Sequence, residues 1–223
     1  MVDKNKLAQL FDHTNLKSYA TARDIDVLCA EAAMYNFATV CVYGYWVDYI
    51  RETYPDIRVC QVLNFPTGLS LSDMVTLSEI NSDATEYDIV MNISKFKEGR
   101  REEVCESLRL VRSYTRGKVL KVIVESGVLT TEELVAATDM VSSVGADFIK
   151  TSTGFISQED SRLIEQVAII SNIVKAHHLP IEIKASGGVK SLDLVRVLIG
   201  LGVTRFGSSS STRIIRELEG GQL

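Results

Sequence analysis

Short apolar segments alternate with longer amphipathic segments along the whole chain. The apolar segments are rich in β-branched residues, which is typical of buried strands. The segments between them repeat apolar residues every three or four positions, as at Ile25, Leu28 and Ala32, and this spacing predicts helices. The expected strands are 10–11, 39–42, 58–63, 87–91, 118–124, 148–150, 181–184 and 203–206. The expected helices are 1–9, 21–35, 45–54, 70–81, 102–114, 130–144, 163–174, 192–201 and a last one from about 209 or 210.

Eight strands that alternate with helices predict a (β/α)8 TIM barrel, an α/β fold. We expect a single domain over residues 1–223 with a short N-terminal helix. An open, doubly wound sheet is the alternative architecture for the same order of elements. Closure is favoured because the strands end in polar residues or glycine, and the C-terminal strand ends of barrels carry the chemistry. These residues are Asp12, Asn64, Lys150, Lys184 and Gly207.

One lysine motif occurs twice. Ile-Lys-Thr-Ser-Thr-Gly at 149–154 returns 34 residues later as Ile-Lys-Ala-Ser-Gly-Gly at 183–188. This offset is about the length of one strand and its following helix. The motif therefore places Lys150 and Lys184 at equivalent positions on neighbouring strands.

The alternation of side chains along the strands predicts a charged barrel interior. We expect Lys121, Lys150 and Lys184 to point inward. Because an unpaired buried ammonium group is costly, either carboxylates neutralise these lysines or one lysine loses its proton. A neutral lysine crowded by another cation is a nucleophile that can form a Schiff base with a carbonyl. The candidate neutralising carboxylates are Asp12, Asp88, Glu125 and Glu182.

The alternative is that each lysine is only a structural ion-pair partner, which is the common role of a single lysine in a strand. Two lysines in repeated contexts, together with an acid inside a strand, favour the functional interpretation. Spacing alone does not choose between Lys150 and Lys184 as the nucleophile.

Glycine and serine turns follow the last two predicted strands. Gly187 and Gly188 follow one strand, and Gly-Ser-Ser-Ser at 207–210 follows the other. Taken alone, such residues form turns and helix caps. Barrels commonly bind phosphate at these two strand ends, through backbone N–H groups and a helix N-terminus. The position beside two lysines therefore indicates a phosphate site, to which Lys190 could add charge.

The composition argues against several other classes of protein. The net charge of −5 is opposite to the basic excess of nucleic-acid-binding proteins, so we expect no nucleic-acid partner. We also expect no membrane association and a cytoplasmic location, because the chain lacks a long apolar run and a signal-peptide pattern. The cysteines and histidines lack the spacing of a metal site or a disulfide framework. They are Cys29, Cys41, Cys60, Cys105, His13, His177 and His178.

Several motifs are found together in this chain, from about Leu10 to Ser210, and the two lysine motifs are the most specific of them. The others are Phe-Asp-His-Thr at 11–14, Val-Cys-Val at 40–42, Asn-Phe-Pro-x-Gly at 64–68, Tyr-Asp-Ile-Val-Met-Asn at 87–92, Leu-Lys-Val-Ile-Val-Glu at 120–125 and Arg-Phe-Gly-Ser-Ser-Ser at 205–210. In this combination the chain resembles the deoxyribose-phosphate aldolase family.

The resemblance implies a class I aldolase that uses no metal and no cofactor. It implies that Lys150 is the Schiff-base lysine and that Lys184 and Asp88 assist it. The implied reaction is the reversible cleavage of 2-deoxy-D-ribose 5-phosphate to acetaldehyde and D-glyceraldehyde 3-phosphate, in deoxyribonucleotide catabolism. The implied substrate-binding residues are Asp12, Cys41 and Thr153 along the channel, and Gly154, Gly187, Gly188, Gly207, Ser209 and Ser210 at the phosphate.

Two positions depart from the family pattern. Lys190 stands where arginine is common, so a point charge replaces a bidentate fork. Tyr43 and Gly44 replace a more usual residue-proline step, which affects substrate preference at that rim.

The resemblance also suggests a homo-oligomer, a dimer or larger. The aromatic segment 45–49 is a candidate interface, and core packing is the alternative for Trp46. Two further functions use the same residues: a Schiff-base aldolase for a different phosphorylated sugar, and a non-catalytic sensor that binds sugar phosphates.

Overall fold

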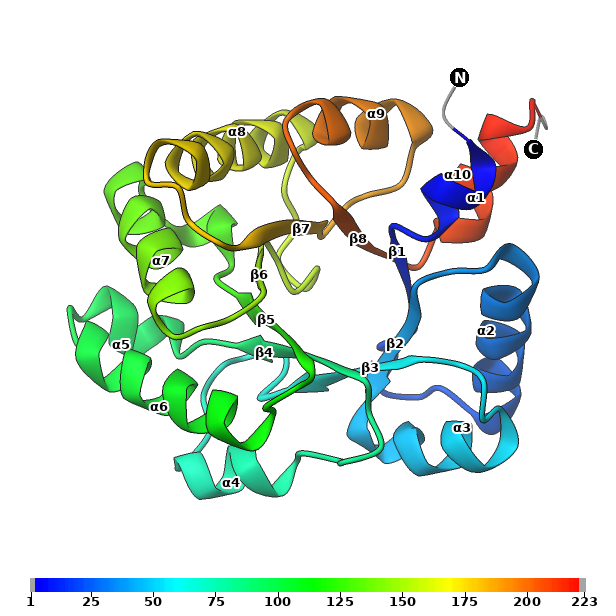
Figure 1. The fold of residues 1–223 in the computed structure, drawn as a ribbon, viewed down its shortest axis with the longest axis horizontal. Coiled ribbons are helices and arrows are strands. Elements are labelled where there is room, and N and C mark those ends of the chain that lie inside the picture. The colour runs from blue at the N-terminus through cyan, green and yellow to red at the C-terminus, as the bar shows by residue number, and fades with distance from the viewer. Residues whose placement is uncertain (1–2, 221–223) are drawn as a thin grey trace.

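The computed structural model describes residues 3–220 and forms a closed barrel of parallel strands (Figure 1). The strands are β1 (Phe11–Thr14), β2 (Thr39–Tyr43), β3 (Val59–Leu63), β4 (Glu86–Val90), β5 (Val119–Ile123), β6 (Phe148–Lys150), β7 (Glu182–Ser186) and β8 (Arg205–Ser208). They pair in chain order, and β8 closes the barrel against β1 with Phe206 opposite Phe11. The predicted barrel is confirmed, and the open-sheet alternative is wrong.

Helices surround the barrel in the part of the chain that the structure describes (Figure 1). They are α1 (Lys4–Ala8), α2 (Ala22–Tyr35), α3 (Val47–Thr53), α4 (Asp73–Ser78), α5 (Ile93–Lys97), α6 (Arg101–Tyr114), α7 (Thr131–Ser143), α8 (Asp160–Ala176), α9 (Leu192–Gly200) and α10 (Ser211–Leu218). Two short 3-10 helices, η1 (Gly44–Trp46) and η2 (Ser126–Val128), follow β2 and β5. The short N-terminal helix is present as α1, and the first two residues of the helix expected at 1–9 lie outside the described residues.

The elements differ from the predicted ones mainly at their ends. The helix expected at 70–81 is only α4, because Ser72 is still extended, with φ −160° and ψ 164°. The strand expected at 203–206 starts at Arg205 and continues to Ser208, so Gly207 is a paired strand residue opposite Asp12. Helix α5 was not predicted; the Asn92 side chain caps it by accepting a hydrogen bond from the Lys95 N–H at 2.9 Å.

Side chains of the strands face two environments. One set packs against the helices and forms an apolar core that includes Val40, Leu120, Ile149 and Phe206. The other set faces the barrel axis and includes buried charges. Barrels usually fill this inner space with branched aliphatic side chains. The inner charges are therefore the feature of this fold that requires a functional explanation.

Two local predictions have clear outcomes. Thr130 and Glu133 form the expected capping box at the start of α7. Of the aromatic segment 45–49, Trp46 and Tyr49 pack against the apolar core, whereas Tyr45 is 83% exposed. Core packing thus accounts for Trp46. Among the described helices, each is too short or too polar to cross a membrane.

Candidate active site

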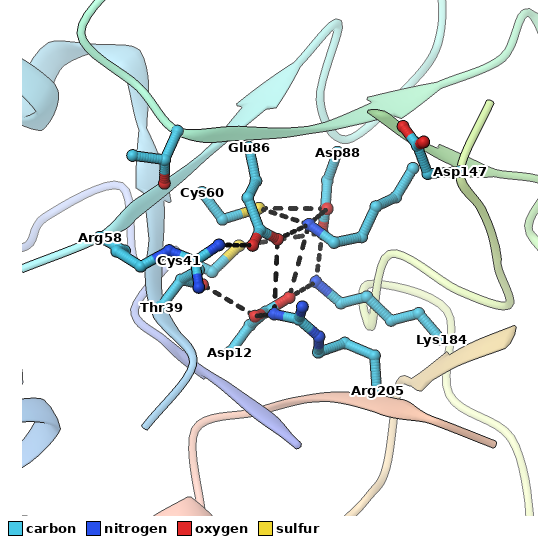
Figure 2. A network of polar contacts seen from close by, with 12 residues as sticks. Asp12, Thr39, Cys41, Arg58, Cys60, Glu86, Asp88, Asp147, Lys184 and Arg205 are labelled. Atoms are coloured by element: carbon cyan, nitrogen blue, oxygen red, sulfur yellow. Dashed lines mark hydrogen bonds and ion pairs between the residues drawn. The ribbon is translucent and has the colours of Figure 1, made fainter. Parts of the chain in front are cut away.

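Asp88, on β4, is the centre of a buried network of charges inside the barrel (Figure 2). Its Oδ2 accepts hydrogen bonds from Lys150 Nζ at 2.8 Å and from Lys184 Nζ at 2.6 Å. Its Oδ1 accepts from Lys121 Nζ at 3.0 Å and from the Cys60 thiol at 3.1 Å. The closed barrel produces this convergence, because β5, β6 and β7 carry the three lysines and β4 carries the carboxylate.

A second layer of the network lies around Asp12 (Figure 2). Asp12 Oδ1 accepts from Arg205 at 2.7 Å and from the Thr39 hydroxyl at 2.8 Å, and Oδ2 accepts from Lys184. Glu86 makes ion pairs with Lys121 at 2.6 Å and with Arg205 at 3.4 Å. Lys184 therefore links the two layers, because it contacts both Asp12 and Asp88.

These contacts keep the inner groups charged. Burial acts to raise the pKa of Asp12, but Lys184, Lys121 and Arg205 hold that pKa well below its usual range. The pKa of Asp88 is also lowered, because the three lysines outweigh burial. Burial acts to lower the pKa of Lys184, and the attraction of Asp12 and Asp88 raises it overall. Lys184 is thus a cation, and the two aspartates are anions.

A cavity of about 650 Å³ opens at the C-terminal ends of the strands, and Lys150 lies at its floor. Six of the other predicted site residues line it: Thr153, Gly154, Gly187, Gly188, Gly207 and Ser209. Asp12 and Cys41, which we expected along the channel, are buried in the network beneath Lys150, together with Asp88 and Lys184. Ser210 lies next to the cavity, where its N–H donates to the Ser208 hydroxyl at 2.9 Å.

At several positions of this rim, the backbone conformation or the nearby atoms disfavour a side chain and so favour glycine. Gly154, Gly187 and Gly188 have φ values of 87°, 79° and 97°, which side chains disfavour. A Cβ on Gly187 would lie 2.8 Å from the Ser152 Cβ. A Cβ on Gly207 would lie 3.2 Å from Cε of Lys184, so the absence of a side chain leaves room for that lysine.

Two thiols lie beside the charged groups. Cys41 and Cys60 are opposite each other on β2 and β3. The pKa of Cys41 is lowered, mainly by a hydrogen bond with Cys60. The pKa of Cys60 is raised, mainly by burial and then by the same hydrogen bond. Their sulfur atoms and an Asp88 oxygen lie within 4.8 Å of one another, which is close enough to bind a thiophilic metal ion. The same Asp88 carboxylate accepts hydrogen bonds from Lys150 and Lys184, so a cation there would compete with the lysines.

Sequence reasoning identified the inner lysines better than their partners. Glu182, which we expected to neutralise them, is exposed at the start of β7 and accepts a hydrogen bond from Thr204, so this expectation is wrong. Glu86 neutralises an inner lysine, Lys121, instead. Glu86 lies two residues before Asp88 on the same strand, so the alternation of side chains places both on the inner face, and this was the signal available in the sequence. Arg205 was also missed; only the position of β8 in the closed barrel brings it to Asp12.

Known proteins are similar to this chain over nearly its whole length. The model of the DeoC/LacD family aldolases matches residues 6–200. A deoxyribose-phosphate aldolase of Mycoplasmoides pirum is 41% identical over 213 residues, which cover 93% of this chain and 96% of that protein. A deoxyribose-phosphate aldolase of Carboxydothermus hydrogenoformans is 38% identical over 231 residues, which cover 100% of this chain and 99% of that protein.

A solved structure gives the same result in three dimensions. The deoxyribose phosphate aldolase of Aeropyrum pernix, described as a unique tetrameric structure, superposes with a TM-score of 0.86 at 29% identity. The match covers 97% of this chain and 92% of that chain. On these grounds the chain belongs to the DeoC/LacD family of aldolases.

Proposed function

We propose that the protein cleaves 2-deoxy-D-ribose 5-phosphate reversibly to acetaldehyde and D-glyceraldehyde 3-phosphate, through a Schiff base on Lys150. The observation that carries this proposal is the shared oxygen of Asp88, which accepts from Lys150 at 2.8 Å and from Lys184 at 2.6 Å. Full-length relatives named deoxyribose-phosphate aldolases support the choice of substrate.

The position of Lys150 supports it as the amine that reacts. The buried carboxylates Asp12, Glu86 and Asp88 each contact at least two of the other cations, Lys121, Lys184, Arg205 and Arg58. Of Lys121, Lys150 and Lys184, it is Lys150 that lines the cavity, where a carbonyl substrate can reach its amine. Lys184 is held as a cation by Asp12 and Asp88, and an ammonium group is not a nucleophile.

The reaction then follows from the groups around Lys150. Its neutral amine attacks C1 of the open-chain sugar, and loss of water gives an iminium ion. When the C2–C3 bond breaks, its electron pair moves into the iminium and forms an enamine. The proton of the C3 hydroxyl is taken by the relay of Asp88 and Lys184 beneath Lys150. Glyceraldehyde 3-phosphate leaves, the enamine is protonated at C2, and hydrolysis releases acetaldehyde.

The rim of the cavity supports a phosphate at the other end of the substrate. Gly154, Gly187 and Gly188 line the cavity with positive φ values, a backbone arrangement that commonly binds anions, and a Cβ on Gly187 would also lie 2.8 Å from the Ser152 Cβ. Ser209 lines the cavity just before the N-terminus of α10, which favours an anion. Lys190 also lines the cavity and supplies a positive charge in place of the arginine common in the family. Ser210 and Gly207 complete the proposed phosphate site.

The test is product analysis. We expect 2-deoxy-D-ribose 5-phosphate to yield acetaldehyde and glyceraldehyde 3-phosphate in equal amounts, as measured by proton NMR. Lys150→Met should yield neither product. Cleavage of another sugar phosphate in its place contradicts the substrate, and binding without any cleavage favours the sensor alternative.

The assembly and location are also part of this proposal. We propose a cytoplasmic homo-oligomer. Exposed apolar side chains, including Tyr45, Leu71 and Met74, support self-association, as does the tetramer described for the Aeropyrum pernix relative. The four free, buried cysteines fit a reducing compartment. Sedimentation velocity should give a mass above that of one chain; a monomer contradicts the assembly.

A further inference from the structure

Glu125 lies at the C-terminal end of β5, beside the loop that follows Lys150. Its backbone is left-handed, with φ 49° and ψ 57°, which is uncommon for a residue other than glycine. Its side chain is buried. A strained backbone at the mouth of a barrel is a reason to examine what that side chain holds.

The carboxylate of Glu125 is bonded to Thr153. The Thr153 N–H donates to Oε1 at 3.3 Å and to Oε2 at 3.2 Å, and the Thr153 hydroxyl donates to Oε2 at 2.5 Å. The Thr153 hydroxyl oxygen in turn accepts from the Phe155 N–H at 3.2 Å. The adjacent Ser126 N–H donates to the Thr151 carbonyl at 2.7 Å, so segment 125–126 is tied to this loop twice.

These bonds determine what Thr153 can offer to a ligand. A threonine hydroxyl has one hydrogen and two lone pairs. The Thr153 hydroxyl donates its hydrogen to Glu125, and one of its lone pairs accepts from the Phe155 N–H. One lone pair and no hydrogen therefore remain for the cavity that Thr153 lines. Thr153 can therefore only accept a hydrogen bond from a bound molecule.

We propose that Glu125 is a positioning residue that fixes the Thr153 hydroxyl as an acceptor for the C4 hydroxyl of the sugar phosphate. The inference rests on the proposed function, which assigns C1 to Lys150, the C3 hydroxyl to Asp88 and the phosphate to the rim from Gly154 onward. Thr153 lines the same cavity as Lys150 and Gly154, and the C4 hydroxyl is the donor of the substrate that this assignment leaves without a partner.

The experiment compares two acceptors in the synthetic direction, each with acetaldehyde. D-Glyceraldehyde 3-phosphate supplies the hydroxyl that becomes C4–OH, and 3-oxopropyl phosphate lacks it. We expect the unaltered protein to prefer the first in kcat/KM by about tenfold, the worth of one good hydrogen bond. Glu125→Gln and Thr153→Val should remove the preference. A glutamine amide can present either its oxygen or its NH2 group to the threonine hydroxyl, so it no longer fixes the direction of that hydroxyl, and valine has no hydroxyl.

Two variants serve as controls. Thr153→Ser keeps the hydroxyl, and Glu106→Gln changes an exposed glutamate of α6, so both should retain the preference. If Glu125→Gln and Thr153→Val retain it as well, the inference is wrong. If Glu125→Gln does not fold, Thr153→Val decides by the same ratio.

Borohydride trapping of acetaldehyde separates this inference from the proposed function, because that step needs no acceptor. We expect Glu106→Gln to form the Lys150 adduct as the unaltered protein does. Failure of the unaltered protein to form it contradicts the Schiff-base mechanism and this inference with it. Adduct formation with an unchanged acceptor preference contradicts only the role of Glu125.

Discussion

Asp88 contacts three lysines, and its two oxygen atoms separate their roles. Oδ2 contacts Lys184 and Lys150, which lines the cavity, whereas Oδ1 contacts Lys121 and Cys60. One carboxylate therefore serves both the proposed proton transfer and the stability of the buried charges. Substitutions at single residues can distinguish these two contributions.

Asp88→Asn tests the proton transfer. The amide keeps the shape of the side chain but cannot take the C3 hydroxyl proton, so kcat for acetaldehyde release should fall by about 10²–10⁴-fold. Asp139→Asn, on the exposed side of α7, is the matched control and should leave kcat unchanged. An unaltered kcat in Asp88→Asn would rule out this carboxylate as the base.

Lys121→Met tests the structural contribution. Lys121 is buried between Glu86 at 2.6 Å and Asp88 at 3.0 Å, so its removal takes one counter-charge away from each of two buried carboxylates. We expect the free energy of unfolding in urea to fall by about 3–5 kcal/mol. Lys95→Met removes a half-exposed partner of Glu103 and should change the free energy of unfolding little. Equal effects of the two substitutions would contradict the account.

The sequence identified the lysines because a charge inside an apolar strand is conspicuous. It identified their partners Asp12 and Asp88 but missed two others, because Glu86 lies at the start of its strand and Arg205 was assigned to a strand placed two residues too early. Which charges meet inside a barrel depends on the stagger between strands that are far apart in the chain, such as β1 and β8. Local patterns carry little information about that stagger.

At the scale of elements, the conformation of the turn after β7 shapes the proposed phosphate site. Gly187→Ala would add a Cβ 2.8 Å from the Ser152 Cβ at a φ of 79°. We expect KM for the sugar phosphate to rise, because the loop must shift away from the proposed phosphate position. Formation of the acetaldehyde adduct on Lys150 should persist, since that step uses no phosphate.

Gly117→Ala is the matched control for Gly187→Ala. Gly117 has nearly the same φ, 77°, but no atom lies within 4 Å of the added Cβ. It should lower the free energy of unfolding by about 1–2 kcal/mol without changing KM. A KM that responds equally to both substitutions would show that backbone strain alone is responsible.

The elements themselves were largely predictable, because buried strands and amphipathic helices have different periods. The exceptions were short or irregular. Helix α5 has five residues, which are too few to show a repeating pattern of apolar positions. Its Asn92 cap is the only signal for it in the sequence. The end of β8 was hidden because Gly207 and Ser208 resemble a turn, although both pair in the sheet.

For the whole molecule, the inner charges predict how stability depends on pH. Asp12 and Asp88 have folded-state pKa values below the ordinary 3.8. Their contribution is therefore fully present above that value and is lost as pH falls through the folded-state values. Lys184 has a raised pKa, so its contribution is present below the ordinary 10.5 and is lost as the pH rises above it.

Urea unfolding across this range checks the prediction. The free energy of unfolding should fall steeply below about pH 4, and Asp12→Asn should make that fall shallower because one of the responsible carboxylates is gone. An equally steep fall in Asp12→Asn would mean that groups outside the barrel interior dominate acid unfolding.

The account depends most on Lys150 being the amine that bonds to the carbonyl carbon. The direct measurement is incubation with acetaldehyde and borohydride, followed by mass spectrometry of the digested protein. We predict one added ethyl group per chain, on Lys150, while Lys184 and Lys121 remain unmodified. An adduct on Lys184, or no adduct on Lys150, would contradict the central claim.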